Sequence, residues 1–191
     1  MSERIFIGVA WPYANGHLHM GHIAGCYLGA DIFARFHRML GNDVLMVSGS
    51  DSHGTPITVR AEQEGIDPED ILNRFHPEFL DSWKQLGISF DLFTTTHTKN
   101  HEEVVQQIFT DLLAKDYIYK ADMLLAYCSK CDRFLPDRYV EGRCPNCSNL
   151  QARGDQCELC GRTLDPQELI SPECILCHTE PEFRVSEHFF L

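Results

Sequence analysis

His19 and His22 are the two side chains whose type and spacing most directly suggest chemistry, and Gly21 lies between them. Pro12 and Gly16 interrupt the apolar run before them, so the histidines should fall on the first turn of a helix. A helix N-terminus presents unpaired backbone N–H groups and the positive end of its dipole, which favours phosphate. Two imidazoles there can face one anion, and Gly21 lets a base or phosphate approach closely. The pattern predicts stabilisation of charge on a phosphate in a transition state, against the alternative of a helix cap with two surface histidines.

Asp51 is the second candidate, in the Gly- and Ser-rich loop of residues 49–57. A fixed carboxylate beside the histidine turn can bind the ammonium group of an amino-acid substrate through a charge-assisted hydrogen bond. An aspartate that closes an Asx-turn is the alternative interpretation. His37, His76, His97 and His101 have no spacing that suggests a shared ligand, and we predict that they are surface or capping histidines.

Eight of the nine cysteines form four C-x-x-C pairs after residue 127, which are Cys128/Cys131, Cys144/Cys147, Cys157/Cys160 and Cys174/Cys177. Each pair supplies two corners of a tetrahedron, so the pattern predicts two zinc sites of four cysteines each. Sites closed by four thiolates leave no position for water, so the metal should be structural. The spacing does not decide which C-x-x-C pairs share a zinc ion. In a sequential arrangement the first pair joins the second and the third joins the fourth, whereas in a nested arrangement the inner two join and the outer two join. A redox function is disfavoured, because it needs one reactive pair on a βαβ scaffold.

Two further residues, His178 and Cys26, are considered beside the four C-x-x-C pairs. His178 comes directly after Cys177 and could replace a thiolate, but eight cysteines already complete two sets. The ninth cysteine, Cys26, is predicted to be a small buried apolar residue.

Alternating strand-like and helix-like segments must position these residues. Apolar runs at residues 5–10 and 43–47 predict parallel strands, the first covered on both faces, joined by a helix that Gly41 ends. Ligands bind beyond the carboxyl ends of such strands, so the Asp51 loop should lie beside the histidine turn. Further helices are predicted at 55–63, 68–86 with a break before Pro77, and about 100–115. Residues 89–94, 124–127, 134–135 and 139–140 look extended, and the chain is predicted to be α/β.

The composition limits the classes of function. The chain has 191 residues, 43% of them hydrophobic, and a formal net charge of −12. The acidic excess argues against a dedicated nucleic-acid-binding surface over most of the chain. No apolar run approaches the roughly 20 residues of a membrane span, and we expect a cytoplasmic protein without a membrane partner.

Residues 12–22 carry a resemblance to a known family. Their sequence, which ends in His19-Met20-Gly21-His22, resembles the His-x-Gly-His signature of class I aminoacyl-tRNA synthetases, and most closely that of methionyl-tRNA synthetases. Residues 49–56 are similar to the Gly-x-Asp-x-His-Gly-x-Pro motif of related synthetases. The resemblance implies the first half of a Rossmann-like nucleotide-binding fold at 1–116. It also implies an inserted β-rich zinc-knuckle domain at 117–181, too short for an editing domain, and a return strand at 182–191.

The resemblance implies that the methionine carboxylate attacks the α-phosphorus of ATP, bound with Mg, and gives methionyl-adenylate and pyrophosphate. The methionyl group would then be transferred to the acceptor end of tRNA(Met). His19 and His22 would be catalytic, and ATP would contact Asn15, His19, Gly21 and His22. Methionine would contact Ala10, Trp11, Tyr13 and Asp51, with Tyr13 as a movable wall and Trp11 in place of an aliphatic residue. The resemblance also favours nested zinc sites: Cys144, Cys147, Cys157 and Cys160 in one, Cys128, Cys131, Cys174 and Cys177 in the other.

The chain lacks the Lys-Met-Ser-Lys-Ser signature of these enzymes, the rest of the methionine pocket and the anticodon-binding helices. We therefore expect that it needs the C-terminal half of a synthetase and does not aminoacylate alone. The alternative is a non-enzymatic zinc-ribbon module that binds protein or nucleic acid. That hypothesis explains residues 117–181 but gives the histidine turn and the Asp51 loop no purpose.

Overall fold

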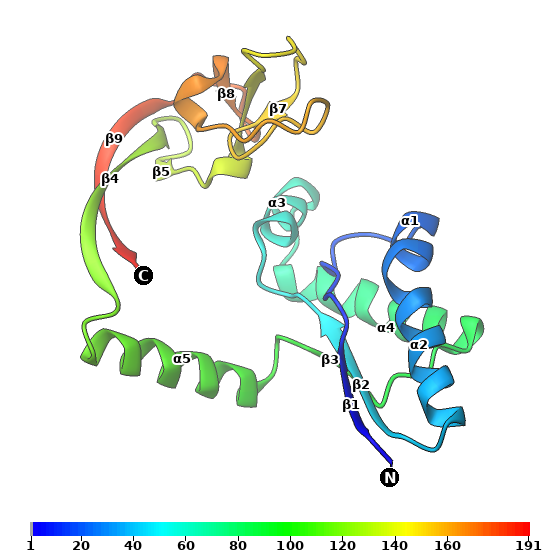
Figure 1. The fold of residues 1–191 in the computed structure, drawn as a ribbon. Coiled ribbons are helices and arrows are strands. Elements are labelled where there is room, and N and C mark those ends of the chain that lie inside the picture. The colour runs from blue at the N-terminus through cyan, green and yellow to red at the C-terminus, as the bar shows by residue number, and fades with distance from the viewer. Residues whose placement is uncertain (1) are drawn as a thin grey trace. The chain divides into compact units, whose positions relative to one another are not determined.

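The computed structural model describes residues 2–191 (Figure 1). The chain forms two compact units, which divide between Val104 and Val105. Helix α5 (Lys99–Ala114) contains this division point. Both units combine helices with strands, and the chain is an α/β protein, as predicted. No helix in the described part of the chain is long and apolar enough to cross a membrane.

The N-terminal unit is built on a parallel sheet of three strands in the order β1-β2-β3. The strands are β1 (Arg4–Gly8), β2 (Asp43–Ser50) and β3 (Leu92–Thr95), and Ile5 lies opposite Val44. A continuous helical segment connects β1 to β2, made of α1 (Met20–His22), a π-helical turn η1 (Ile23–Tyr27) and α2 (Leu28–Met39). Helices α3 (Thr55–Glu64) and α4 (Pro68–Leu86) connect β2 to β3. The first two strands and all three connecting helices lie where the sequence predicts them.

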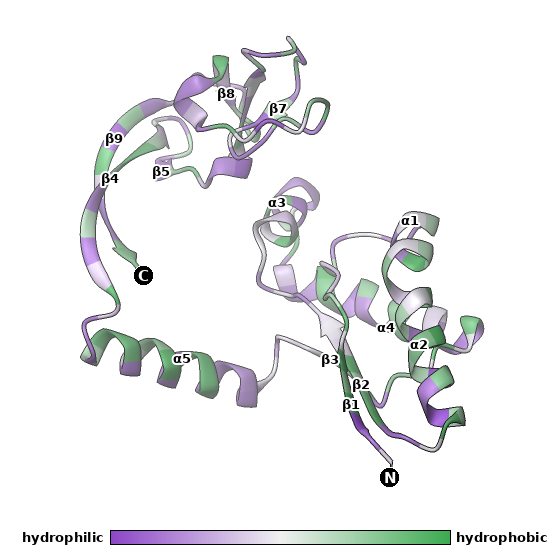
Figure 2. Cartoon of the chain, in the orientation of Figure 1, coloured by the Kyte–Doolittle hydropathy of each residue, from purple (hydrophilic) through white to green (hydrophobic). Residues whose placement is uncertain are grey.

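Helix α4 supplies much of the core of this unit. Its buried side chains recur at helical spacing, and they are Ile71, Leu72, Phe75, Phe79 and Trp83. They pack against the face of the sheet that carries the buried Met46. On the other face of the sheet, Phe6 is 70% exposed and Leu45 is 49% exposed. Figure 2 shows the hydrophobic residues along β1 and β2. The prediction that the first strand is covered on both faces is therefore wrong within this unit.

The predicted break before Pro77 is also wrong, because α4 continues through it from Pro68 to Leu86. Proline removes one backbone N–H and disfavours the helical conformation of the preceding residue. Phe75 and Phe79, which flank Pro77 in sequence, are both buried in the core. Their packing holds both halves of the helix in line and outweighs the local cost.

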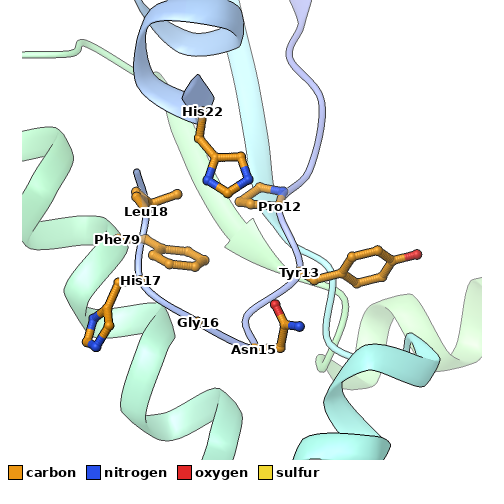
Figure 3. A pocket seen from close by; sticks show the side chains of 8 residues that line it. All are labelled: Pro12, Tyr13, Asn15, Gly16, His17, Leu18, His22 and Phe79. Atoms are coloured by element: carbon orange, nitrogen blue, oxygen red, sulfur yellow. The ribbon is translucent and has the colours of Figure 1, made fainter. Parts of the chain in front are cut away.

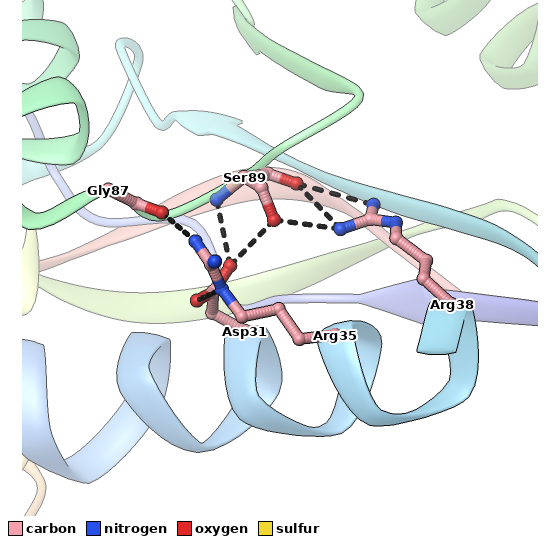
Figure 4. A network of polar contacts seen from close by, with 5 residues as sticks. All are labelled: Asp31, Arg35, Arg38, Gly87 and Ser89. Carbon is pink, nitrogen blue, oxygen red and sulfur yellow. Dashed lines mark hydrogen bonds and ion pairs between the residues drawn. The ribbon is translucent and has the colours of Figure 1, made fainter. Parts of the chain in front are cut away.

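A buried carboxylate, Asp31, joins α2 to the segment between α4 and β3 (Figure 4). One oxygen accepts from the Ser89 backbone N–H and hydroxyl, each at 2.8 Å, and the other accepts from Arg35 at 2.6 Å. Arg38 donates to the Ser89 hydroxyl and to Asp91, which also accepts the backbone N–H of Met46. Burial alone would raise the pKa of Asp31, but the hydrogen bonds from Ser89 and Arg35 lower it.

The C-terminal unit contains two small sheets of three strands each. The first has the order β5-β4-β9, with β4 (Tyr119–Cys128), β5 (Arg133–Phe134) and β9 (Glu182–Phe190). Strands β4 and β9 are antiparallel from Tyr119 opposite Phe190 to Tyr127 opposite Glu182. The second sheet has the order β7-β6-β8, with β6 (Val140–Arg143), β7 (Ala152–Arg153) and β8 (Ile170–Cys174).

Two short 3₁₀ helices complete this unit, η2 (Asp137–Tyr139) and η3 (Pro166–Glu168). Tyr139 ends η2, so it does not lie in the extended segment predicted for it. Strand β4 is longer than the predicted residues 124–127, because its pairing with β9 extends it.

Candidate functional site

His19 and His22 cap the start of the helical segment by hydrogen bonds to each other's backbone. His19 Nδ1 accepts from the N–H groups of Gly21 (3.1 Å) and His22 (3.4 Å), and His22 Nδ1 accepts from His19 N–H (3.4 Å). Their rings stack with centroids 3.8 Å apart. Because both Nδ1 atoms accept, the proton of each neutral ring must lie on Nε2. The structure thus contains the cap and also leaves two exposed Nε2–H donors.

Burial and the neighbouring His19 both lower the pKa of His22. A neutral imidazole is therefore favoured at His22 near pH 7, and it acts as a hydrogen-bond donor without a full positive charge. Gly21 is required for this arrangement, since a Cβ there would lie 2.9 Å from His19 Cε1.

The π-helical turn η1 directly follows His22 and ends at Tyr27, whose ring is buried. The Tyr27 ring centroid lies 4.5 Å from that of Trp83 on α4. Short π-helical turns inside helices occur often at functional sites. Here the turn connects the exposed histidines to a buried aromatic anchor only five residues later. Cys26, in the same turn, is partly buried against the core and so less buried than predicted.

A small pocket of about 110 Å³ opens beside this turn (Figure 3). Figure 3 shows the ring of His22 and the ring of Phe79 directed toward it, with Asn15 at its edge. Arg60 of α3 donates a hydrogen bond of 2.5 Å to the carbonyl of Asn15. This contact fixes the loop that brings Asn15 into the pocket wall. The remaining lining residues are Pro12, Tyr13, Gly16, His17 and Leu18.

The loops that follow β1 and β2 lie side by side, and this prediction from the sequence is confirmed. Asp51 N–H donates to Pro12 O at 2.8 Å, and Ala14 N–H donates to Asp51 O at 3.2 Å. Tyr13 and Asp51 form a parallel bridge beyond the ends of the two strands. The residues expected to contact phosphate and those expected to contact an amine therefore come from two joined loops.

Two glycines of the second loop make room for aromatic rings of the first. A Cβ on Gly49 would lie 2.5 Å from Trp11 Cζ3, and a Cβ on Gly54 would overlap the Tyr13 ring. Trp11 and Tyr13 keep 40% and 44% of their surface exposed. Both rings thus lie directly against glycine backbone near Asp51, and each keeps exposed surface that a ligand can cover.

Asp51 is half-buried, and among the described residues its Oδ1 accepts only a long hydrogen bond of 3.4 Å, from His53 N–H. This contact is the Asx-turn of the alternative interpretation. It leaves most of the acceptor capacity of the carboxylate unused, because an ionised carboxylate has about four acceptor positions. The turn and the binding of an ammonium group are compatible at this residue.

Sequence reasoning missed His76. Predicted as a surface or capping residue, it is half-buried on α4, and its Nδ1 lies 2.7 Å from Ser50 Oγ. Burial lowers the pKa of His76. The signal available in the sequence was its position one residue after Phe75, on the apolar face of a predicted helix.

The eight cysteines of the C-x-x-C pairs gather in two sets of four, in the nested arrangement. The sulfur atoms of each set lie within 4.8 Å of one another. In one set, the Sγ–Sγ distance is 3.4 Å between Cys128 and Cys177 and 4.0 Å between Cys131 and Cys174. The other set has 3.9 Å (Cys144–Cys160) and 3.5 Å (Cys147–Cys157). Four sulfurs at about 2.3 Å from one zinc would lie about 3.8 Å apart, so both sets fit a tetrahedral zinc ion.

The four cysteine turns share one backbone design. The residue after each pair has a positive φ, and these residues are Asp132, Ser148, Gly161 and His178. Three of the turns also share a pair of backbone hydrogen bonds. In the turn that begins at Cys144, the Cys144 N–H donates to the carbonyl of Asn149, and the Ser148 N–H donates to the carbonyl of Cys144. Backbone N–H groups also point at sulfur, for example Cys131 N–H to Cys128 Sγ at 3.4 Å.

Hydrogen bonding also acts on individual thiols. The pKa of Cys177 is lowered to about 6, mainly by a hydrogen bond from the Thr179 side chain. His178 occupies the positive-φ position of its turn, and its Nδ1 lies 3.1 Å from Glu173 Oε1. His178 contacts a carboxylate and belongs to neither four-cysteine set, as expected of a bystander.

Comparison with known proteins agrees with these features. The family described as tRNA synthetases class I (M) matches residues 5–191. The chain belongs to this family. A methionine-tRNA ligase of Thermomicrobium roseum is 61% identical over 190 residues, and one of Thermoplasma volcanium is 57% identical over 188. The chain spans 32% and 35% of these two relatives, about a third of their length.

The class I fold is also seen in solved structures. The Mycobacterium tuberculosis methionyl-tRNA synthetase in complex with methionyl-adenylate aligns with a TM-score of 0.65 over 98% of this chain and 32% of that chain. Sequence identity in this alignment is 21%, so the likeness supports the fold.

Proposed function

We propose that this chain is the N-terminal part of a methionine-tRNA ligase. The observation that carries the proposal is the junction of the two loops, which places the His19–His22 turn and the Asp51 carboxylate at adjacent carboxyl ends of parallel strands. The curated relatives at about 60% identity are methionine-tRNA ligases. Residues 1–116 are then half of a Rossmann-like catalytic fold, 117–181 a zinc-binding insertion and 182–191 the return strand.

In the proposed reaction, the methionine carboxylate attacks the α-phosphorus of ATP, which is bound with Mg. The bond between the α-phosphorus and the bridging oxygen breaks, so that pyrophosphate leaves and methionyl-adenylate is formed. The Nε2–H groups of His19 and His22 donate hydrogen bonds to the phosphate oxygens as negative charge accumulates. Such preorganised donors lower the barrier because they need no reorganisation at the moment of reaction. The bonds between the histidines and the backbone keep each ring in the donating tautomer.

The substrates are bound by groups of the same two loops. Asp51 accepts hydrogen bonds from the α-ammonium group of methionine, and Ala10, Trp11 and Tyr13 contact the rest of the amino acid. Asn15 and Gly21 accommodate ATP. The methionyl group then passes to the acceptor end of tRNA(Met) in the cytoplasm.

The two cysteine sets would each bind a structural zinc ion, Cys144, Cys147, Cys157 and Cys160 in one, Cys128, Cys131, Cys174 and Cys177 in the other. Zinc supplies no chemistry to the reaction, because four thiolates complete its coordination. It would hold together a unit that has two small sheets of three strands each.

Methionine-dependent exchange of pyrophosphate into ATP tests the proposal. The full-length protein that contains this chain should catalyse the exchange, and the 191-residue chain alone should not, because it lacks the lysine signature. Exchange by the chain alone would contradict the need for a C-terminal half. No exchange by the full-length protein would contradict the ligase proposal and favour a zinc-ribbon binding module.

A further inference from the structure

Three serines on alternate positions of β2 and the loop after it form a buried row of hydroxyl groups. Ser48 and Ser50 are completely buried, and Ser52 is 7% exposed. Alternate residues of a strand point to the same face, and this face continues from the core residue Met46. Apolar side chains are the usual occupants of such positions. Serine hydroxyl groups at these buried positions indicate that hydrogen bonds, and not only apolar packing, hold this end of the strand in place.

Each hydroxyl bonds to a different neighbouring element. Ser48 Oγ donates to Ala10 O after β1 at 3.2 Å, and Ser52 Oγ lies 2.5 Å from Thr95 Oγ1 at the end of β3. Ser50 Oγ lies 2.7 Å from His76 Nδ1 on α4. The end of β2 and the loop after it are thus attached to the loop after β1, to β3 and to α4 through these three hydroxyl groups.

His76 is held in place by more than the bond to Ser50. Its ring stacks on Phe93 of β3 with centroids 5.9 Å apart and an interplanar angle of 24°. Phe93 lies opposite Ser48 in the parallel register of β2 and β3. The imidazole therefore covers the junction of these strands with one nitrogen on Ser50, in a setting where burial favours the neutral ring.

Asp51 follows Ser50 directly, and its backbone contacts the loop that follows β1. Its backbone is held from one side by Pro12 and Ala14 of that loop. From the other side it is held through Ser50, whose carbonyl accepts from Thr96 N–H at 3.0 Å and whose hydroxyl meets His76. Within residues 2–191, the carboxylate itself accepts only the long hydrogen bond from His53 N–H. The backbone at residues 50 and 51 therefore determines where this side chain starts, and a shift of that backbone moves the carboxylate.

We propose that His76 is a positioning residue for amino-acid binding, acting through Ser50 on the Asp51 carboxylate. This inference rests on the proposed function, because it assigns Asp51 to the substrate amine. His76 touches no substrate. Its loss leaves the buried Ser50 hydroxyl without a partner, which releases the end of β2 from α4 and moves the carboxylate away from the ammonium group.

The test compares His76→Ala, His76→Asn and Ser50→Ala in the full-length enzyme by pyrophosphate exchange, with His101→Ala on α5 as the matched control. In His76→Ala, the KM for methionine should rise about 10-fold, while the KM for ATP should change less than about 2-fold. Asparagine can place an amide group near the position of Nδ1, so His76→Asn should recover most of the methionine affinity. The double variant His76→Ala/Ser50→Ala should resemble the worse single variant, because each substitution removes the same hydrogen bond between Ser50 and His76.

Other outcomes overturn the inference. An unchanged KM for methionine in His76→Ala would show that Ser50 does not need His76. Equal rises in the KM for methionine and for ATP, or additive effects of the two single changes, would show that His76 only stabilises α4. These results all require an active parent enzyme, and absence of exchange in the parent would overturn the proposed function and the inference together.

Discussion

Each of the histidines His19 and His22 accepts the backbone N–H of the other at Nδ1, at 3.4 Å in both directions. The reciprocal bonds explain why a capping arrangement and a catalytic one coexist in the same pair. One nitrogen of each ring is used to begin the helix, and the other is left to donate. Neither histidine can change its tautomer without giving up a cap.

Replacement of His22 should impair adenylate formation without affecting zinc. In the full-length enzyme, His22→Ala should lower the rate of pyrophosphate exchange by about 10²-fold, the usual effect of removing one transition-state donor. The metal content per chain should stay the same, because the cysteine sets lie in the other unit. His101→Ala is the control and should keep the parent rate. A His22→Ala enzyme with parental exchange would rule out the assigned role.

Substitution of Gly21 should act through His19. The Cβ of Gly21→Ala would lie 2.9 Å from His19 Cε1, so the ring must leave its stacked position. We expect about 10-fold slower exchange, attributable to misplacement of one donor. Gly25→Ala is the matched control, because a Cβ there meets nothing within 4 Å and alanine favours helix. Equal rates in the two variants would contradict the steric argument.

Substitution of Gly49 should act on methionine. A Cβ at this position would collide with the Trp11 ring and with Thr94 O, which lies 2.7 Å away. Gly49→Ala should therefore displace Trp11 and raise the KM for methionine more than the KM for ATP. Gly29→Ala, with open space around the added carbon, is the control for this pair of measurements. A uniform loss of activity at unchanged KM values would count against a methionine-contacting role of Trp11.

Two equivalents of zinc should bind per chain. Cys157→Ser and Cys174→Ser should each lose one equivalent, and the double variant should lose both, as measured by atomic emission on the purified protein. Cys26→Ser should retain both. Zinc binding requires loss of the thiol protons, so the affinity should fall as the pH is lowered. Retention of two equivalents in Cys157→Ser would show that the sulfur sets are wrongly assigned.

Asp31 should contribute stability that depends on pH. Its pKa is lowered on folding, so its contribution is present above the ordinary value of 3.8 and is lost as the pH falls through the lower value in the folded state. Asp31→Asn leaves buried donors of Ser89 without a carboxylate and should cost about 2 kcal/mol in urea unfolding at pH 7. The exposed Asp43→Asn should cost much less. Similar losses for both variants would contradict the role of Asp31.

The sequence predicted the elements of the N-terminal unit well, because helix and strand patterns are local. Gly41, Gly65 and Gly87 adopt positive φ at the helix ends, where only glycine does so without strain. The predicted break before Pro77 is absent because the local cost of a proline is smaller than the gain from burying Phe75 and Phe79 on the same helix.

The site was predicted in part. The approach of the Asp51 loop to the histidine turn followed from the rule for parallel strands, and it was found. The contact between His76 and Ser50 joins residues 26 positions apart, and the local sequence around either residue does not predict it. Spacing also could not choose between nested and sequential cysteine pairs, because all four turns have the same local geometry and the strands between them decide which turns meet.

The nesting of the two cysteine sets has a consequence for the order of assembly. The inner set joins Cys144 to Cys160, 16 residues away, whereas the outer set joins Cys128 to Cys177, 49 residues away. Closing the longer loop from an unfolded chain costs about 1 kcal/mol more in chain entropy. Once the inner set has closed, part of the outer loop is already shortened. The first metal ion should therefore prepare the binding of the second, and a newly made chain should acquire its zinc from the inside outward.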